Sequence, residues 1–210
     1  MGSYADDALF MSRNNIEYVE LISDDGKSKV MVIPAWQGRV MTTSAAGDEG
    51  DSYGWINYSF IKKRQIDLQF NPVGGEERFW LGPEGGVFSL YFRQGEKQIY
   101  KNWKVPPVLD IEAFKIQSQS KNCICLTKEG CLTNACGTTF YLNIKRTISL
   151  LDINEFAASF NLEFPKDIKA VAYKSDNQIT NIGNESWNKE TGLISVWMLS
   201  MFNPTSATTV

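Results

Sequence analysis

The feature that most limits the fold of this chain is a succession of short runs rich in Val, Ile, Thr, Tyr and Phe, separated by Gly, Asp, Asn and Pro. The first group of residues favours extended backbone and the second favours turns. Helical stretches long enough to connect parallel strands are absent. The pattern therefore predicts an all-β fold, an antiparallel β-sandwich, and 43% hydrophobic residues among 210 suffice for one sizeable core.

Eleven runs carry this strand signal, with a hairpin turn at Asp25-Gly26 between the first two. The predicted strands are residues 16–22, 28–34, 39–44, 55–61, 87–93, 109–118, 122–127, 138–150, 154–164, 170–180 and 193–202. One short helix is expected at about residues 5–13, because Asp6 and Asp7 precede an apolar cluster as in a first helical turn.

The chain shows no internal repeat and no low-complexity linker, which predicts one domain over residues 1–210. The apolar run near the C-terminus is followed only by Asn203 to Val210, without a cap. That ending is typical of a sandwich that continues beyond this chain.

The absence of histidine excludes several kinds of chemistry within this chain. Ser-His-Asp triads, Cys-His pairs and HExxH zinc sites cannot form, so acid–base catalysis would need carboxylates, Tyr, Lys or Cys with shifted pKa values. Twenty-one Lys and Arg against 24 Asp and Glu give a formal charge of -3, which offers no basic surface for nucleic acid. No window is apolar for long enough to predict a membrane span.

Four cysteines lie close together at Cys123, Cys125, Cys131 and Cys136, but their spacing does not match a zinc site. We expect buried or partly buried free thiols, with a disulfide between Cys131 and Cys136 as the alternative. The acidic residues 48–51 lack the ligand spacing of a calcium loop and predict a solvated loop. No metal and no cofactor is therefore expected.

The opening Met1-Gly2-Ser3 lacks the charged and apolar regions of an export signal. If these residues replace a removed signal, the protein is periplasmic or extracellular; otherwise the sequence leaves the location open.

Residues 71–87 form the segment with the highest density of chemically useful side chains, including five glycines. The segment lacks the Gly-Lys-Ser/Thr of a phosphate loop, and its glycines allow a ligand or another strand to approach closely. We interpret Glu76, Arg78 and Trp80 as substrate-binding residues and Glu84 as the candidate catalytic, protonatable group. The alternative is that Arg78 pairs with a nearby glutamate to brace the loop, while Trp80 belongs to the core.

A second group of candidate substrate-binding residues is Trp36, Gln37 and Arg39, at a turn between two predicted strands. A flat aromatic face, an amide and a guanidinium are the groups that proteins use to bind sugars. The alternative is a hairpin corner whose tryptophan fills the end of the sandwich.

These segments together resemble a Bacteroidetes-type, uncharacterised bacterial family related to the galactose mutarotase-like and aldose 1-epimerase proteins. The residues that carry the resemblance are 34–43, 54–57, 74–86, 134–137, Arg146 and 177–187. The resemblance implies a β-supersandwich with a concave carbohydrate-binding face, in relatives longer than this chain. The aldose 1-epimerases use a histidine acid and a glutamate base, and this chain has no histidine.

Three functions therefore stay open at this point. The chain binds a carbohydrate without turnover, or acts on a sugar at its anomeric carbon, or is a structural or interaction sandwich that pairs with another copy or chain through an exposed edge near Val210. In the catalytic interpretation Arg78 holds a sugar oxygen while Glu84 transfers a proton. Unchanged mutarotation after Glu84→Gln would refute that role.

Overall fold

The structure is a computed structural model that describes residues 2–165 and 167–208; Met1 and Val210, the ends of the predicted domain, lie outside the described residues. Its strands form three antiparallel sheets, ordered β1-β2-β3, β4-β9 and β5-β6-β7-β8. The strands are β1 (Val19–Ile22), β2 (Lys29–Ile33), β3 (Arg39–Ser44), β4 (Arg78–Gly82), β5 (Lys115–Gln119), β6 (Cys123–Thr133), β7 (Thr139–Leu150), β8 (Tyr173–Asn181) and β9 (Ser195–Leu199). The predicted all-β, antiparallel fold is confirmed.

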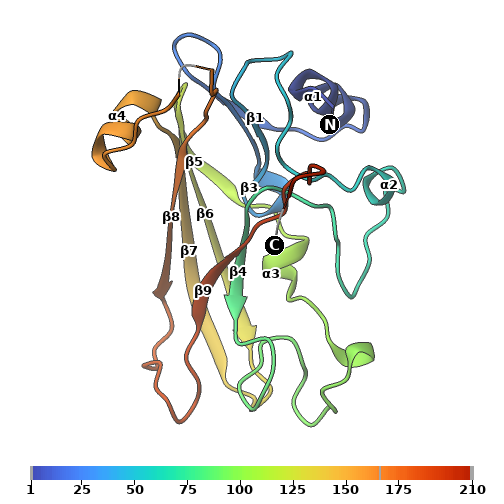
Figure 1. Cartoon of the computed structure of the whole chain (residues 1–210). Helices are drawn as coiled ribbons and strands as arrows, with labels where there is room; N and C mark the ends of the chain where they lie inside the picture. The colour runs from blue at the N-terminus through green and yellow to red at the C-terminus, as the bar shows by residue number, and fades with distance from the viewer. Residues whose placement is uncertain (1, 166, 209–210) are drawn as a thin grey trace.

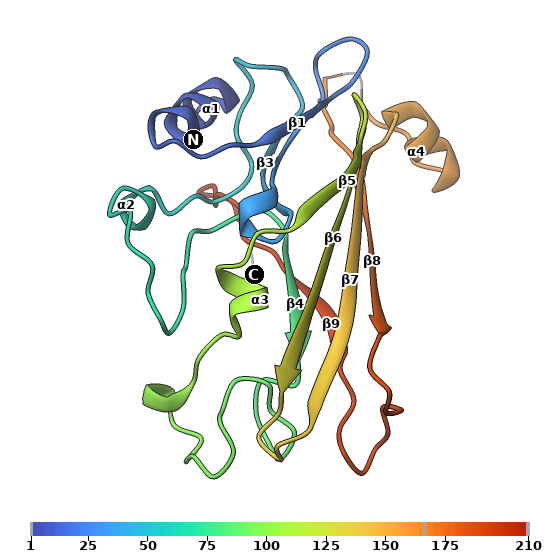
Figure 2. The ribbon, with the colours of Figure 1, turned by 180° about the vertical axis from the view of Figure 1, so that it is seen from behind.

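The strands pack in two layers (Figures 1 and 2). Val40 and Glu77 exchange two backbone hydrogen bonds of 3.1 Å, which join β3 to the segment leading into β4. The sheets β1-β2-β3 and β4-β9 therefore form one layer, and β5-β6-β7-β8 forms the other. The main core lies between them, with Phe79 of β4 and Ile144 of β7 among its fully buried members.

Strand β2 is buried on both faces because each face has its own core. Val30 and Val32 point into the main core, whereas Met31 and Ile33 point into a second, smaller core under helix α1 (Tyr4–Arg13). This alternation follows from the two-residue period of a strand. The N-terminal helix thus covers the outer face of the β1-β2-β3 sheet.

Helix α1 agrees with the predicted N-terminal helix. Ser3 and Asp6 form a capping box at its start. The buried Asp7 carboxylate accepts hydrogen bonds from the hydroxyls of Ser52 and Tyr58, which fixes the helix to the sheet. No helix in the described part of the chain is both long and apolar enough to cross a membrane.

Two predicted strands are wrong because side-chain caps start helices there. Residues 55–61 contain α2 (Tyr58–Ile61), whose first turn begins where the Asn57 side chain accepts the Phe60 amide at 3.2 Å. Residues 154–164 overlap α4 (Ile153–Ser159), where the Asp152 carboxylate accepts two amides of the first turn. Asn and Asp are favoured N-caps, and that local signal outweighs alternating apolar residues.

Two further strand predictions fail around the loops that follow β4. Residues 87–93 form no strand, although Leu90 and Tyr91 are buried in the main core. Residues 109–118 begin in the short helix α3 (Pro107–Asp110), which starts at a proline, and only β5 is extended. Two 3-10 turns, η1 (Pro34–Trp36) and η2 (Tyr100–Asn102), complete the fold.

Strand β6 is longer than the predicted residues 122–127, since β7 pairs with all of Cys123–Thr133. Pairing with β7 keeps residues 128–133 in the extended conformation, although several of them are polar and have a weak preference for strands. The four thiols are free: Cys125 is buried and Cys123 partly buried, whereas Cys131 and Cys136 are exposed. The expected burial is therefore wrong for the last two, which lie at the hairpin end of β6 and β7.

Gly54 provides a test of how closely β3 and the following loop approach. A Cβ at this position would lie 2.0 Å from the Met41 carbonyl oxygen and 2.9 Å from Thr42 Cα. We expect Gly54→Ala to lower the free energy of unfolding by about 1–3 kcal/mol in urea titrations, because backbone cannot move aside without strain. The matched control is Gly85→Ala, whose nearest contact is 3.8 Å away; an equal loss in both variants would contradict the packing argument.

Candidate functional site

Three arginines, Arg39, Arg78 and Arg146, are each 1% exposed or less. Burial lowers the pKa of all three guanidinium groups. Arg78 pairs with Asp110 at 2.8 Å and Arg146 with Glu77 at 2.8 Å. Arg39 donates to the Gly74 carbonyl at 2.7 Å and has no carboxylate partner among the described residues. The arginines that the sequence singled out thus lie in the interior and bind the protein itself.

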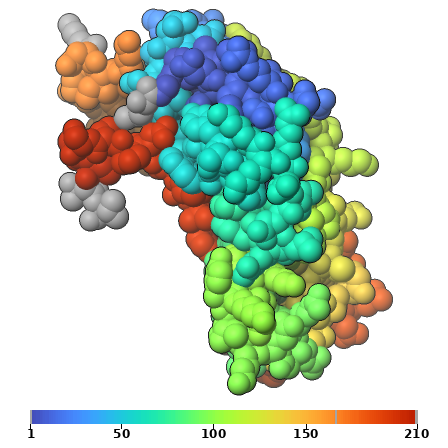
Figure 3. Space-filling model, turned by 90° about the vertical axis from the view of Figure 1, so that its right-hand side faces the viewer, coloured from blue at the N-terminus to red at the C-terminus, as the bar shows by residue number. Residues whose placement is uncertain are grey.

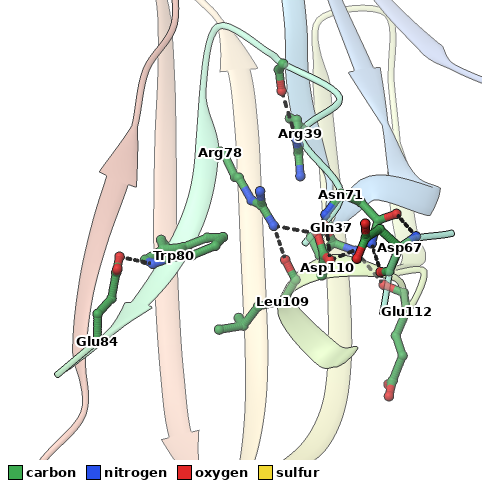
Figure 4. A network of polar contacts seen from close by, with 11 residues as sticks. Gln37, Arg39, Asp67, Asn71, Arg78, Trp80, Glu84, Leu109, Asp110 and Glu112 are labelled. Carbon is green, nitrogen blue, oxygen red and sulfur yellow. Dashed lines mark hydrogen bonds and ion pairs between the residues drawn. The ribbon is translucent and has the colours of Figure 1, made fainter. Parts of the chain in front are cut away.

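Arg78 belongs to the polar network drawn in Figure 4. Its Nη2 donates to Asp110 Oδ1 at 2.8 Å and to the Leu109 carbonyl at 3.0 Å. Asn71 donates to Asp110 Oδ2 from its backbone nitrogen at 3.0 Å and from its side chain at 2.7 Å. A bracing ion pair is therefore present, but its acid is an aspartate of α3 and not a glutamate of the glycine-rich loop.

Trp80 separates Arg78 from Glu84, the predicted catalytic residue. The Arg78 guanidinium lies 4.1 Å from the Trp80 ring, while the indole nitrogen donates to Glu84 Oε1 at 2.7 Å (Figure 4). Trp80 is 2% exposed and stacks on Tyr91 at 5.4 Å, so it is a core residue. The structure does not bring Arg78 and Glu84 together at one open site.

The Trp36-Gln37-Arg39 group is also divided. Gln37 is 1% exposed and donates to the Glu112 carbonyl at 3.0 Å, whereas Trp36 lines an open pocket near α1. Of the seven predicted site residues, Trp36 lines one pocket and Glu76 lines a different one.

Glu76 is positioned by the two glycines before it. Gly74 and Gly75 have positive φ angles of 92° and 117°. A Cβ on Gly74 would lie 2.3 Å from the Trp55 carbonyl oxygen, and a Cβ on Gly75 would lie 2.6 Å from Arg39 Cδ. The close approach places the Glu76 amide 3.2 Å from the Met41 carbonyl of β3. The Thr43 hydroxyl, also on β3, then lies within 3.0 Å of both carboxylate oxygens.

The surroundings of Glu76 favour its protonated form. Burial is the main cause that raises its pKa to about 7, the charge of Glu77 adds to the rise, and the hydrogen bonds from Thr43 oppose it. The nearby Tyr173 hydroxyl also opposes the rise, and its own pKa is raised by burial and by the charges of Glu76 and Glu77. Glu76 can therefore gain or lose a proton near neutral pH beside a phenol that stays protonated.

Glu76 lies at the wall of an open pocket of about 750 Å³. The pocket is bounded by β3, α4, the segment before β8 and the segment after β9; Figure 3 shows α4 and the C-terminal segment projecting together from one side. Its aromatic residues are Tyr53, Phe156, Phe164, Tyr173 and Phe202. Its polar residues besides Glu76 are Thr43, Asp51, Lys169, Asn203 and Thr205.

The chain matches the model of the Family of unknown function (DUF6786) over residues 2–210. This chain belongs to DUF6786. No curated protein and no solved structure matches this DUF6786 chain. Its site must therefore be interpreted from geometry.

Sequence reasoning missed most residues of the Glu76 pocket. Thr43 and Tyr173 lie in correctly predicted strands but form no local motif with Glu76. Phe156 lies in a helix where the sequence predicts a strand, so the predicted direction of its side chain is wrong. The one usable signal was the Gly-Gly pair before Glu76, since paired glycines indicate a close backbone approach.

The raised pKa of Glu76 predicts how stability depends on pH. Between about pH 4.5 and 7 the native state keeps a proton that the unfolded state has lost, so the free energy of unfolding falls as pH rises through this window. Glu76→Gln removes the effect. We expect this DUF6786 variant to gain about 2–3 kcal/mol relative to wild type between pH 5 and pH 8, measured by urea unfolding. A pH-independent difference would contradict the raised pKa.

Substitution of the neighbouring Glu77 is expected to lower the stability of the protein, the opposite of substituting Glu76. Glu77→Gln leaves the buried Arg146 guanidinium without its carboxylate, so we expect a loss of about 3–5 kcal/mol at pH 8. Asp24→Asn, which breaks the exposed Lys121–Asp24 pair, serves as the control and should leave stability unchanged. A loss no larger than that of the control would show that the buried pair does not hold the layers together.

Proposed function

We propose that this DUF6786 chain binds a carbohydrate in the Glu76 pocket and that Glu76 takes the proton of the hydroxyl group on the anomeric carbon. The observation that carries the proposal is a buried carboxyl group with a pKa of about 7 at the wall of an open pocket of about 750 Å³. Titratable groups shifted toward neutrality in a large pocket are candidate acid–base residues.

The lining of the pocket supports a sugar more than an apolar or strongly charged ligand. Aromatic rings such as Tyr53 and Phe202 offer flat faces for sugar C–H groups. The Tyr173 hydroxyl and the Asn203 side-chain oxygen offer hydrogen-bonding groups for sugar hydroxyls. Asp51 and Lys169 carry opposite charges, so these two flanking residues favour neither an anion nor a cation.

The resemblance to galactose mutarotase-like proteins supports the same substrate class. Its most specific part, the Gly-Gly-x-x-Arg-x-Trp-x-x-Pro-Glu core at residues 74–84, spans Glu76 but leaves the residue at that position unspecified. The aldose 1-epimerases of that superfamily use a histidine acid, which this chain lacks. The proposal therefore gives the proton transfer to Glu76 and a hydrogen-bonding role to Tyr173.

The proposed step is the opening of the sugar ring. Ionised Glu76 takes the proton of the anomeric hydroxyl, and the released electron pair forms the C1=O bond. The bond between C1 and the ring oxygen breaks, and the ring oxygen takes a proton from water in the open pocket. Closure on the other face of the carbonyl reverses these transfers, so Glu76 ends as it began.

Mutarotation of a panel of aldoses, followed by polarimetry, tests the proposal. Wild type should accelerate mutarotation of at least one sugar, with a rate that rises with pH through about 7 as Glu76 ionises. Glu76→Gln should lose about a hundredfold or more in rate. Saturation-transfer NMR on the same variant should still show the bound sugar, because the amide keeps most hydrogen-bonding capacity.

Glu84→Gln is the matched control, since Glu84 belongs to the same glycine-rich loop but does not line the Glu76 pocket. Loss of activity in Glu84→Gln with normal activity in Glu76→Gln would transfer the catalytic role to Glu84. Binding without mutarotation in wild type would reduce the proposal to carbohydrate recognition.

A non-catalytic interaction sandwich is the second candidate. Within the described residues β9 pairs only with β4, so its other edge is open. Val196 and Trp197 on β9 are 37% and 39% exposed, and an open edge with apolar side chains can pair with another chain. A concentration-dependent dimer in light scattering that Trp197→Lys abolishes would favour this candidate.

A further inference from the structure

A second pocket, of about 400 Å³, lies on another part of the molecule and shares no lining residue with the Glu76 pocket. It opens between the end of α1, the turn η1, helix α2 with the residues that follow it, and α3. Its volume lies within the range of small-molecule sites. The proposed function leaves this pocket unused.

Left-handed backbone at non-glycine residues gathers around this pocket. Asn15 and Arg64, which line it, have φ angles of 59° and 52°, and Gln37 next to the lining Trp36 has 61°. Of the described residues only Asn161 shares this feature elsewhere. These conformations end the helices and the turn that border the pocket: Gln37 is the C-cap of η1, and Asn15 follows the C-cap of α1. The walls are therefore held in a set shape.

The floor of the pocket is polar but already satisfied. Asp110 accepts hydrogen bonds from Arg78 and Asn71, and its charge is balanced by Arg78 at 2.8 Å. A ligand anion at the floor would meet this carboxylate, so the floor disfavours negative charge. Trp36, Phe60 and Ile66 instead offer apolar surface, and Ile66 is 67% exposed.

The mouth of the pocket carries unused polar groups. The Arg64 guanidinium donates to the Arg13 carbonyl at 3.2 Å and has no carboxylate partner in the part of the chain that the structure describes. The side chains of Asn15 and Gln65 make no hydrogen bond to any described residue. A planar guanidinium and two amides that line one pocket are groups that can bind a carboxylate.

We propose that this pocket binds an aromatic carboxylate. The ring lies against Trp36, Phe60 and Ile66, and the carboxylate stays at the mouth, where Arg64 donates to both of its oxygens. This orientation keeps the negative charge away from Asp110 and covers the exposed Ile66 side chain. The site is independent of the carbohydrate pocket.

Calorimetric titration with 2-naphthoate and with its neutral amide, 2-naphthamide, tests the proposal. Wild type should bind the acid about fivefold more tightly than the amide, as a charge-assisted pair at a partly open site gives. Arg64→Gln should remove this preference. Ile66→Asp changes an exposed position, so it should have little effect on folding. Its added negative charge should weaken the binding of the acid more than the binding of the amide.

Two controls make the result specific. Lys62→Gln removes an equal charge two residues away, where the ammonium lies 5.9 Å from the Phe10 ring and outside the pocket lining, and it should keep the preference. Glu76→Gln should also keep it. The proposal is overturned if wild type binds neither probe or binds both with equal affinity. It is also overturned if Lys62→Gln and Arg64→Gln weaken the binding of 2-naphthoate to the same extent.

Discussion

The ion pair between Glu77 and Arg146 is the contact on which the arrangement of this protein depends. The backbone of Glu77 joins β3 to β4 through Val40, and its side chain reaches Arg146 on β7 in the opposite layer. One residue therefore connects both halves of one layer and ties that layer to the other. The adjacent Glu76 forms no ion pair with a described residue, and burial raises its pKa, with the charge of Glu77 adding to the rise.

Much of the architecture could be predicted because strand burial follows local periodicity. The alternation of Phe140, Leu142 and Ile144 in β7 is visible in the sequence and persists in the structure. The failures at α2 and α4 arose where Asn57 or Asp152 caps a helix inside an alternating stretch. A helix cap is indicated by one side chain, whereas a strand is indicated by the alternation of many residues. The sequence prediction therefore followed the alternation and missed the two caps.

The candidate site could be predicted only in part, for a different reason. Arginine, glutamine and tryptophan beside glycines suggest binding whether their partner is a ligand or the protein itself. Arg78 and Gln37 proved to bind α3 and the chain just after it, which the sequence places far away. Glu76 was named, but the hydroxyls that surround it come from Thr43 and Tyr173, and only the folded topology brings those strands together.

The pairing of β4 with β9 has a consequence for how the protein acquires its structure. More than a hundred residues separate the two strands, and Asn203, just after β9, donates to the Ser52 and Gly54 carbonyls. Contacts between such distant segments form late, since the entropy of closing the intervening loop opposes them. On the ribosome, β4 therefore emerges as an unprotected edge and must wait until β9 has been synthesised. The wall of the Glu76 pocket that includes Phe202 is completed only after β9 has emerged.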